Sequence, residues 1–231
     1  MPRKYIIACR EVSSPITDLV TKFGGQPVWV DEPSWPLSRQ YGTPMQFICQ
    51  IALPADLFSS LPARMAYLFV SDDYDHGSVA ETCEPKGGEN ALILQPEGTW
   101  EATTLPLRDG PSLYRRTRHS SQWERTPCEF AVELHAGDDL DVGAWDDVDP
   151  DDTPAWDAYM DALFEDKIGG APVPTVNKPE FPDPAHWRLL LQLNTKDNEA
   201  GDPFFLNLAS DGVGYAFISR DGHRGRFLWS R

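Results

Sequence analysis

The sequence predicts a mainly antiparallel α+β protein in which two pseudo-twofold-related repeats pack into one globular unit. Three observations carry this prediction: a seven-residue word occurs twice, many short apolar runs have the length of strands, and 21 prolines interrupt the chain. Stretches with helical periodicity are few. With 231 residues, 41% of them hydrophobic, the chain is long enough to bury a sizeable core.

The duplicated word reads Lys-x-Gly-Gly-x-Pro-Val and stands at residues 22–28 and again at residues 167–173. After each copy come an aromatic residue followed by proline, an apolar run with a central glutamine, and a Tyr-x-Phe-x-Ser segment. Three anchors in the same order indicate one unit copied twice. We assign the following residues to this repeated structural motif: Gly24, Gly25, Pro27, Gln50, Gly169, Gly170, Pro172 and Gln192.

We expect a single domain over residues 1–231. The first repeat covers about residues 1–110, a connecting Arg-rich and Asp-rich segment about residues 111–152, and the second repeat about residues 153–231.

In the first repeat, residues 5–8 are predicted to form a short strand, and residues 14–20 a helix with Ser14 as its cap. The Gly-Gly-x-Pro stretch predicts a turn, because glycine permits positive φ. Apolar runs predict strands at residues 43–50, 65–70 and 91–94, and residues 54–61 read as one or two helical turns.

In the connecting segment, residues 130–134 alternate as a half-exposed strand does, and residues 137–152 read as a solvated loop. Thr153 and Pro154 then open the clearest helix, with Thr153 as N-cap. Trp156, Met160, Leu163 and Phe164 form its apolar stripe, and the next Gly-Gly pair ends it. Further strands are predicted at residues 187–193, 204–208, 213–219 and 225–229.

The composition argues for a protein of the cytoplasm. No apolar run approaches the roughly 18 residues of a membrane span, and the first residues turn polar too soon for a secretory signal. The four cysteines are far apart and contain no Cys-x-x-Cys pair, so we expect reduced thiols, no disulfide framework and no zinc site.

Charge is distributed unevenly. Residues 126–166 carry 14 carboxylates and no Lys or Arg, so the formal charge of −16 leaves only −2 for the remainder of the chain. A field this one-sided repels nucleic acid and anionic membranes and attracts basic partners. Arg115, Arg116 and Arg118, directly upstream, are expected to pair with this acidic stretch in the same molecule or a neighbour.

The acidic stretch is the candidate partner-binding site. Calcium is a weaker interpretation, because the positions that an EF-hand reserves for Gly and Glu hold Asp152 and Ala158. Aromatic residues favour binding hot spots, so Trp145 and Trp156 are candidate anchors, Trp156 being the better core residue. The electrostatic footprint that we assign, with its anchor, comprises Asp138, Asp139, Asp141, Trp145, Asp146, Asp147, Asp149, Asp151 and Asp152.

No catalytic residues, cofactor or metal site are assigned. The five histidines stand singly, and neither a nucleophile elbow nor a phosphate-binding Gly-Lys-Ser/Thr loop is present. A structural role suits the repeated Gln50 and Gln192 better than a functional one, each amide satisfying backbone groups of its own Gly-Gly turn.

Residues 22–29, 44–51 and 213–218 resemble the YwqG-like family of bacterial domains of unknown function. A similar duplicated word occurs in the eukaryotic programmed-cell-death-two group, which resembles chaperones for a basic ribosomal protein. This chain lacks the zinc-binding cysteines of that group. The resemblance implies no catalytic residues, and an association of the bacterial family with toxin loci implies an immunity role.

Three functions follow as hypotheses. The first is a non-catalytic protein-binding module, most concretely an immunity protein that masks a basic toxin domain. The second is a chaperone or assembly factor for a basic cytoplasmic client. The third is an enzyme or small-ligand binder at the cleft between the repeats.

Overall fold

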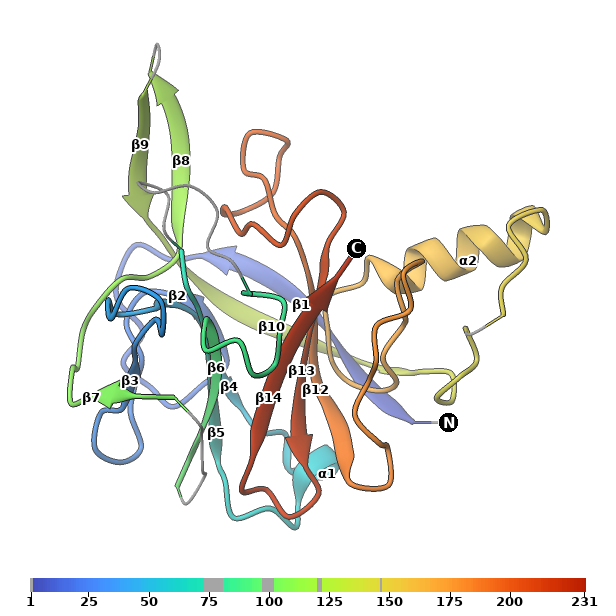
Figure 1. Cartoon of the computed structure of the whole chain (residues 1–231), viewed down its shortest axis with the longest axis horizontal. Coiled ribbons are helices and arrows are strands. Elements are labelled where there is room, and N and C mark those ends of the chain that lie inside the picture. The colour runs from blue at the N-terminus through green and yellow to red at the C-terminus, as the bar shows by residue number, and fades with distance from the viewer. Residues whose placement is uncertain (1, 73–80, 97–101, 120–121, 146) are drawn as a thin grey trace.

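The structure is a computed structural model that describes residues 2–72, 81–96, 102–119, 122–145 and 147–231 (Figure 1). Ten strands form one sheet in the order β14-β13-β12-β11-β1-β10-β2-β4-β5-β6, and each paired neighbour is antiparallel. Their bounds are β1 (Arg3–Glu11), β2 (Lys22–Gly24), β4 (Gln46–Ala52), β5 (Met65–Val70), β6 (Asn90–Gln95), β10 (Glu129–Asp138), β11 (Lys167–Gly169), β12 (Trp187–Asn194), β13 (Val213–Ser219) and β14 (Gly225–Ser230).

Two pairs of shorter or separate strands and two helices complete the described residues. Strand β3 (Trp35–Pro36) pairs with β7 (Thr104–Leu105), and β8 (Tyr114–His119) with β9 (Gln122–Pro127). The helices are α1 (Ala55–Phe58) and α2 (Thr153–Leu163). The prediction of mainly antiparallel β structure is confirmed, whereas helices this short do not show the α+β class.

The large sheet is nearly closed. Its outermost strands, β6 and β14, lie beside one another, each at the end of one half of the sheet (Figure 1). Gly225 makes this approach possible, because a Cβ at that position would stand 2.4 Å from the carbonyl oxygen of Leu92. We call this junction the seam.

The centre of the sheet is the pair β1 and β10. Strand β10 belongs to the predicted connecting segment, yet it pairs with β1 along all nine residues of that strand. Strand β2 then adds to β10, and β11 adds to β1. The segment expected to connect two repeats therefore supplies a central strand of the sheet.

Strands β4, β5, β6 and β13 are buried on both faces, as their continuous apolar runs predict, whereas the central strands β1 and β10 are only partly buried. In β5, Leu68 belongs to one hydrophobic cluster and Phe69 to another on the opposite face. In β13, Ile218 and Tyr215 divide in the same way. The first cluster joins residues from both halves of the chain, whereas the other two clusters each cover one half.

The predicted helix at residues 14–20 is wrong. This segment is irregular, and tertiary contacts take the backbone groups that a helix would use. Ile16 donates its N–H to the Glu129 carboxylate, and the Gln50 amide donates to the carbonyl oxygens of Asp18 and Val20. Hydrogen bonds from side chains of distant strands therefore determine the conformation of this segment, and the local capping signals do not.

Helix α2 forms as predicted, but its ends and its buried face differ. Asp152 is the N-cap in place of Thr153, and the helix ends at Leu163, well before the glycine pair. Buried side chains on the helix are Tyr159 and Leu163, while Phe164 is 40% exposed. The glycine pair instead lies at the end of β11, a separate strand whose last residue is Gly169.

The Arg-rich stretch forms the hairpin β8–β9, which extends away from the large sheet (Figure 1). The sequence does not predict it, since its residues are mostly polar and exposed. Residues 204–208, predicted as a strand, make only isolated bridges, from Phe205 to Tyr114 and from Leu206 to Lys196. No helix among the described residues is long and apolar enough to span a membrane.

Candidate functional site

The two copies of the duplicated word make the same contacts. Gly24 and Gly25, like Gly169 and Gly170, have φ between 64° and 76°, a region that glycine adopts without strain. In each copy, the residue after the proline donates its N–H to the glutamine of the following strand, at 2.8 Å for Gln50 and 3.0 Å for Gln192. The amide nitrogens of both glutamines donate to carbonyl oxygens before the word.

The lysine that opens each word is buried and forms an ion pair with a carboxylate, which the sequence pattern does not reveal. Lys22 lies 2.6 Å from Glu129, and Lys167 lies 2.7 Å from Asp139. Burial holds the pKa of Lys167 below its usual range, although the Asp139 carboxylate acts in the opposite direction. The recurrence of lysine at the first position of the word is the feature of the sequence that could have indicated this shared structural role.

Asp139 is therefore an error in the predicted partner-binding footprint. Its side chain is buried, accepts hydrogen bonds from Lys167 and from the backbone N–H of Ala171, and lies 3.6 Å from Lys4. A carboxylate with these partners is part of the core and does not face a partner protein. Three further carboxylates of the acidic stretch are paired with lysines of the same molecule and are not free to bind a partner: Glu129, Glu165 and Asp166.

The other acidic residues of the footprint lie at the surface where they are described. Asp146 lies outside the described residues. Trp145 is half-buried and packs against Tyr159 of α2, with ring centroids 6.1 Å apart, so it joins the core cluster of the second half. The exposed members of the footprint are Asp138, Asp141, Asp147, Asp149, Asp151 and Asp152.

Within the molecule, Arg115 and Arg116 of the hairpin pair with acids outside the acidic loop, and pairing with a neighbouring molecule stays a prediction. Arg115 contacts Glu11 at 2.7 Å, and Arg116 contacts Asp197 at 2.7 Å. Arg116 also lies over the rings of Trp123 and Phe205, at 4.5 Å and 3.9 Å from their centroids. These contacts anchor the hairpin to the sheet.

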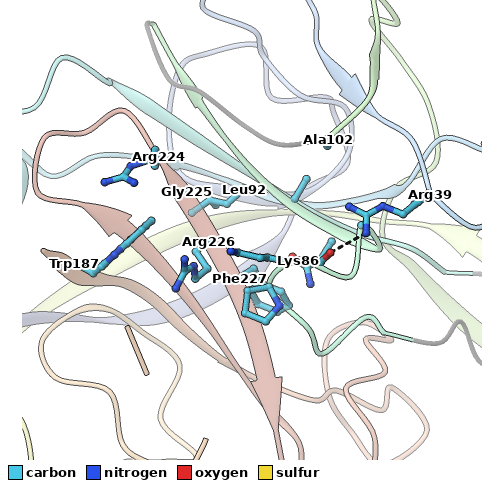
Figure 2. A pocket seen from close by; sticks show the side chains of 13 residues that line it. Arg39, Lys86, Leu92, Ala102, Trp187, Arg224, Gly225, Arg226 and Phe227 are labelled. Atoms are coloured by element: carbon cyan, nitrogen blue, oxygen red, sulfur yellow. Dashed lines mark hydrogen bonds between the residues drawn. The ribbon is translucent and has the colours of Figure 1, made fainter. Parts of the chain in front are cut away.

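The most distinctive cavity lies at the seam between β6 and β14. It has a volume of about 260 Å³, and we call it the seam pocket. Four cationic side chains line it: Arg39, Lys86, Arg224 and Arg226. None of the described residues that line it is Asp or Glu. Figure 2 shows Arg224 and Trp187 at one end, Arg39 at the other, and Lys86 and Arg226 between them.

Two cations reach the pocket from the first half of the chain. Arg39 packs on Gly88, where a Cβ would stand 2.5 Å from the arginine Nε, so only glycine leaves room for it. Its Nη1 donates to the carbonyl oxygen of Lys86 at 2.9 Å (Figure 2). Asn90 holds the loop that carries Lys86 by donating to the carbonyl oxygens of Thr82 and Glu84.

The other two cations come from the second half. Arg224 and Arg226 are two positions apart at the start of β14, so their side chains point to the same face. Both guanidinium groups lie over the ring of Trp187, at 5.4 Å and 4.8 Å from its centroid. Hydrogen bonds between Ser219 and Arg224 fix the turn before this strand. The aromatic ring thus holds both guanidinium groups at the pocket.

Among the described residues, none of the four cations forms an ion pair within 4.0 Å. Convergent unpaired cations can bind an anion through charge-assisted hydrogen bonds. No pattern in the sequence indicates this site, because its four cations come from three segments far apart in the chain. The described residues also hold no group of three or more His, Cys, Asp or Glu placed to bind a metal.

Comparison with known proteins identifies a family. No curated protein matches the chain. One family model, described as a domain of unknown function (DUF1963), matches residues 21–223, which include both copies of the duplicated word and most of the seam pocket. The chain belongs to this DUF1963 family.

Proposed function

We propose that the protein is a non-catalytic binding module whose seam pocket takes a small anionic ligand of the phosphate or phosphate-ester class. The observation that carries the proposal is the convergence of Arg39, Lys86, Arg224 and Arg226 on one cavity without a carboxylate in its described lining. Guanidinium groups match phosphate oxygens in pairs, and lysine adds a point charge. The site corresponds to the cleft between repeats of the third hypothesis.

The acidity of the whole protein does not oppose this binding. Surface charges farther away than about 8 Å are largely screened at physiological ionic strength. A ligand inside the seam pocket contacts a lining that contains four cations and, among the described residues, no carboxylate. Trp187 and Phe227 add apolar surface to the lining, which suits an anion with an organic group better than a bare ion.

The test is isothermal titration calorimetry with pyrophosphate as the probe. We expect the double variant R224Q/R226Q to bind pyrophosphate at least about tenfold more weakly than the unmodified protein, since each lost charged hydrogen bond costs roughly 1.5–3 kcal/mol. The control is R10Q, which removes an exposed arginine of β1 that does not line the pocket. Equal loss of affinity in R10Q would mean that only net charge matters.

A second candidate function uses the other charged surface. The six exposed aspartates between Asp138 and Asp152 leave a strongly negative patch beside α2, and such a surface suits a basic protein. The partner is a basic toxin domain if the protein has an immunity role, or a basic client if it is a chaperone. The resemblance to YwqG-like proteins favours the immunity role, and both roles place the protein in the cytoplasm.

Affinity capture from the native lysate at low and moderate salt tests this second function. The variant D141N/D147N/D149N/D151N should lose a basic partner that the unmodified protein retains. Its matched control is E32Q/D109N/E180Q/D211N, which neutralises four exposed acids elsewhere. Identical capture by both variants would exclude the acidic patch as the binding surface.

We further propose that the two halves arose by duplication and are related by a pseudo-twofold axis. The matched hydrogen bonds of Gln50 and Gln192 support this relation, as do the matched bulges in β4 and β12. Superposing residues 22–70 on residues 167–219 tests it. Coincidence of the paired strands after a rotation near 180° is expected, and a rotation far from that value contradicts the axis.

A further inference from the structure

A second cavity lies beside the second copy of the duplicated word. It has a volume of about 350 Å³ and is lined by Gly169 and Gly170, so we call it the Gly-Gly cavity. Phe181, Trp187 and Phe217 give it aromatic walls. This volume is at the low end of the range for ligand pockets, about 300–1,000 Å³, so its occupant is small.

Among the residues that the structure describes, two arginines of this cavity have no anionic partner within 4.0 Å. Arg188 donates from Nη1 to the carbonyl oxygen of Leu57, but its solvent-inaccessible Nε has no hydrogen-bond partner in the described structure. Arg220 donates from Nε and Nη2 to the carbonyl oxygen of Pro184. Burial first, and then the charge of Arg220, hold the pKa of Arg188 below its usual range. None of the described lining residues is Asp or Glu.

The first half of the chain contains a corresponding place. Phe47 pairs with Phe69 directly before a bulge in β4, as Leu189 pairs with Phe217 directly before a bulge in β12. By the spacing between the two glutamines, Arg188 corresponds to Gln46. The cavity wall formed by Arg188, Leu189 and Phe217 therefore has a counterpart in the first half.

In the first half, the chain itself fills that place. Phe47 donates its N–H to the carbonyl oxygen of Pro111 at 2.8 Å and accepts from the N–H of Leu113 at 3.2 Å. Gln46 donates from its amide to the carbonyl oxygen of Ser112. An extended segment of backbone thus lies against the strand at the position where the second half has the Gly-Gly cavity.

The leucine of this segment has only a partial substitute in the second half. A Cβ at Gly24 would stand 3.3 Å from Leu113, and a Cβ at Gly169 would stand 2.6 Å from Leu57 of α1. Leu57 therefore takes the place of Leu113, while the rest of the space remains as the cavity. The charge of its lining has also changed, because an arginine stands where the first half has a glutamine.

We propose that the Gly-Gly cavity binds the C-terminal end of an extended peptide, with Arg188 and Arg220 holding the terminal carboxylate. The last side chain of the peptide is apolar and packs against Phe181 and Phe217. The backbone of the peptide takes the place that residues 111 and 112 occupy in the first half, and its carboxylate lies where Gln46 contacts the carbonyl oxygen of Ser112 there. This site is separate from the seam pocket, although Trp187 lines both.

Fluorescence anisotropy with labelled Gly-Pro-Leu, the sequence of residues 110–112 with leucine in place of Ser112, tests the proposal. The peptide with a free C-terminal carboxylate should bind at least about tenfold more tightly than the same peptide with a C-terminal amide, since the amide loses the charged contact. R188Q, which installs the residue of the first half, should remove this preference. The comparison of the two peptides needs no variant, so it holds even if R188Q fails to fold.

R226Q is the matched control, because it removes an arginine of the seam pocket alone. It should leave the preference for the carboxylate peptide unchanged. Equal binding of the carboxylate and amide peptides, or no binding of either at millimolar concentration, would overturn the proposal. Isovalerate that competes as strongly as unlabelled peptide would overturn the assignment to a peptide in favour of a free acid.

Discussion

Two neighbouring aspartates show how much the role of a residue depends on its surroundings. Asp139 and Asp141 stand in the same acidic stretch and have the same sequence context of charge. Asp139 is 6% exposed and bonded to Lys167, whereas Asp141 is exposed. From the sequence, both were predicted to belong to one surface, since nothing local marks the aspartate that a distant lysine needs.

The variant D139N should therefore be much less stable than D141N. Removing one member of a buried ion pair leaves an uncompensated charge on Lys167 and costs about 3–5 kcal/mol of unfolding free energy. D141N should change stability by less than about 0.5 kcal/mol. Urea denaturation measures both, and equal stability of the two variants would contradict the burial of the pair.

Tyr215 offers a test that depends on pH. Its hydroxyl is buried and donates to the carbonyl oxygen of Val173, and burial raises its pKa well above the ordinary 10.0. The folded protein therefore keeps a proton that the unfolded chain releases above pH 10. The stabilisation is complete below pH 10 and is lost as pH rises toward the folded pKa.

Tyr215→Phe should lower the unfolding free energy at pH 7 by about 1–3 kcal/mol, because the Val173 carbonyl loses its partner. Between pH 10 and pH 11 the unmodified protein should lose about 1 kcal/mol relative to the variant, since only half of the unfolded phenol is still protonated at pH 10. Guanidinium denaturation at pH 7, 9, 10 and 11 measures the difference. A difference that stays constant over this range would mean that the phenol is not shielded from titration.

Among the elements, the β8–β9 hairpin departs most from the sequence prediction. Alternation of apolar and polar residues is the usual signal of a strand, and this hairpin has arginines in place of the apolar residues. Trp123 and Phe205 cover the guanidinium group of Arg116, so stacking replaces aliphatic burial. The strands that consist of continuous apolar runs, by contrast, could be predicted from the sequence in both halves of the chain.

R116A should destabilise the protein by about 1–2 kcal/mol, since it removes two cation–π contacts and the ion pair with Asp197. R118A is the matched control, because Arg118 is exposed and lies 5.8 Å from the centroid of Trp123 alone. Its effect should be below about 0.5 kcal/mol. Urea denaturation and hydrogen exchange of the hairpin amides provide the measurements, and equal effects would contradict the stacked arrangement.

The ends of helix α2 also could not be predicted from the sequence. The sequence predicts the helix correctly from its N-terminal polar residues and apolar periodicity. Its C-terminal end depends on Gln192. The side-chain amide of Gln192 donates to the carbonyl oxygens of Ala162, Leu163 and Glu165, so these carbonyl groups are satisfied without further helical turns. A strand almost thirty residues away therefore decides where the helix stops.

At the scale of the whole molecule, near closure of the sheet creates the candidate site. The duplicated word predicts two similar sets of strands, but no local pattern shows that β6 and β14 meet. The four cations Arg39, Lys86, Arg224 and Arg226 come together only through that meeting. The acidic stretch, by contrast, is visible in the sequence because its carboxylates lie in one continuous segment.

The central claim is that the seam pocket binds an anion, and a crystal structure of the protein with pyrophosphate tests it most directly. The account predicts electron density for pyrophosphate in the seam pocket, within hydrogen-bond distance of Arg224, Arg226 and at least one of Arg39 and Lys86. An empty seam pocket at a pyrophosphate concentration that saturates binding in solution would contradict the claim.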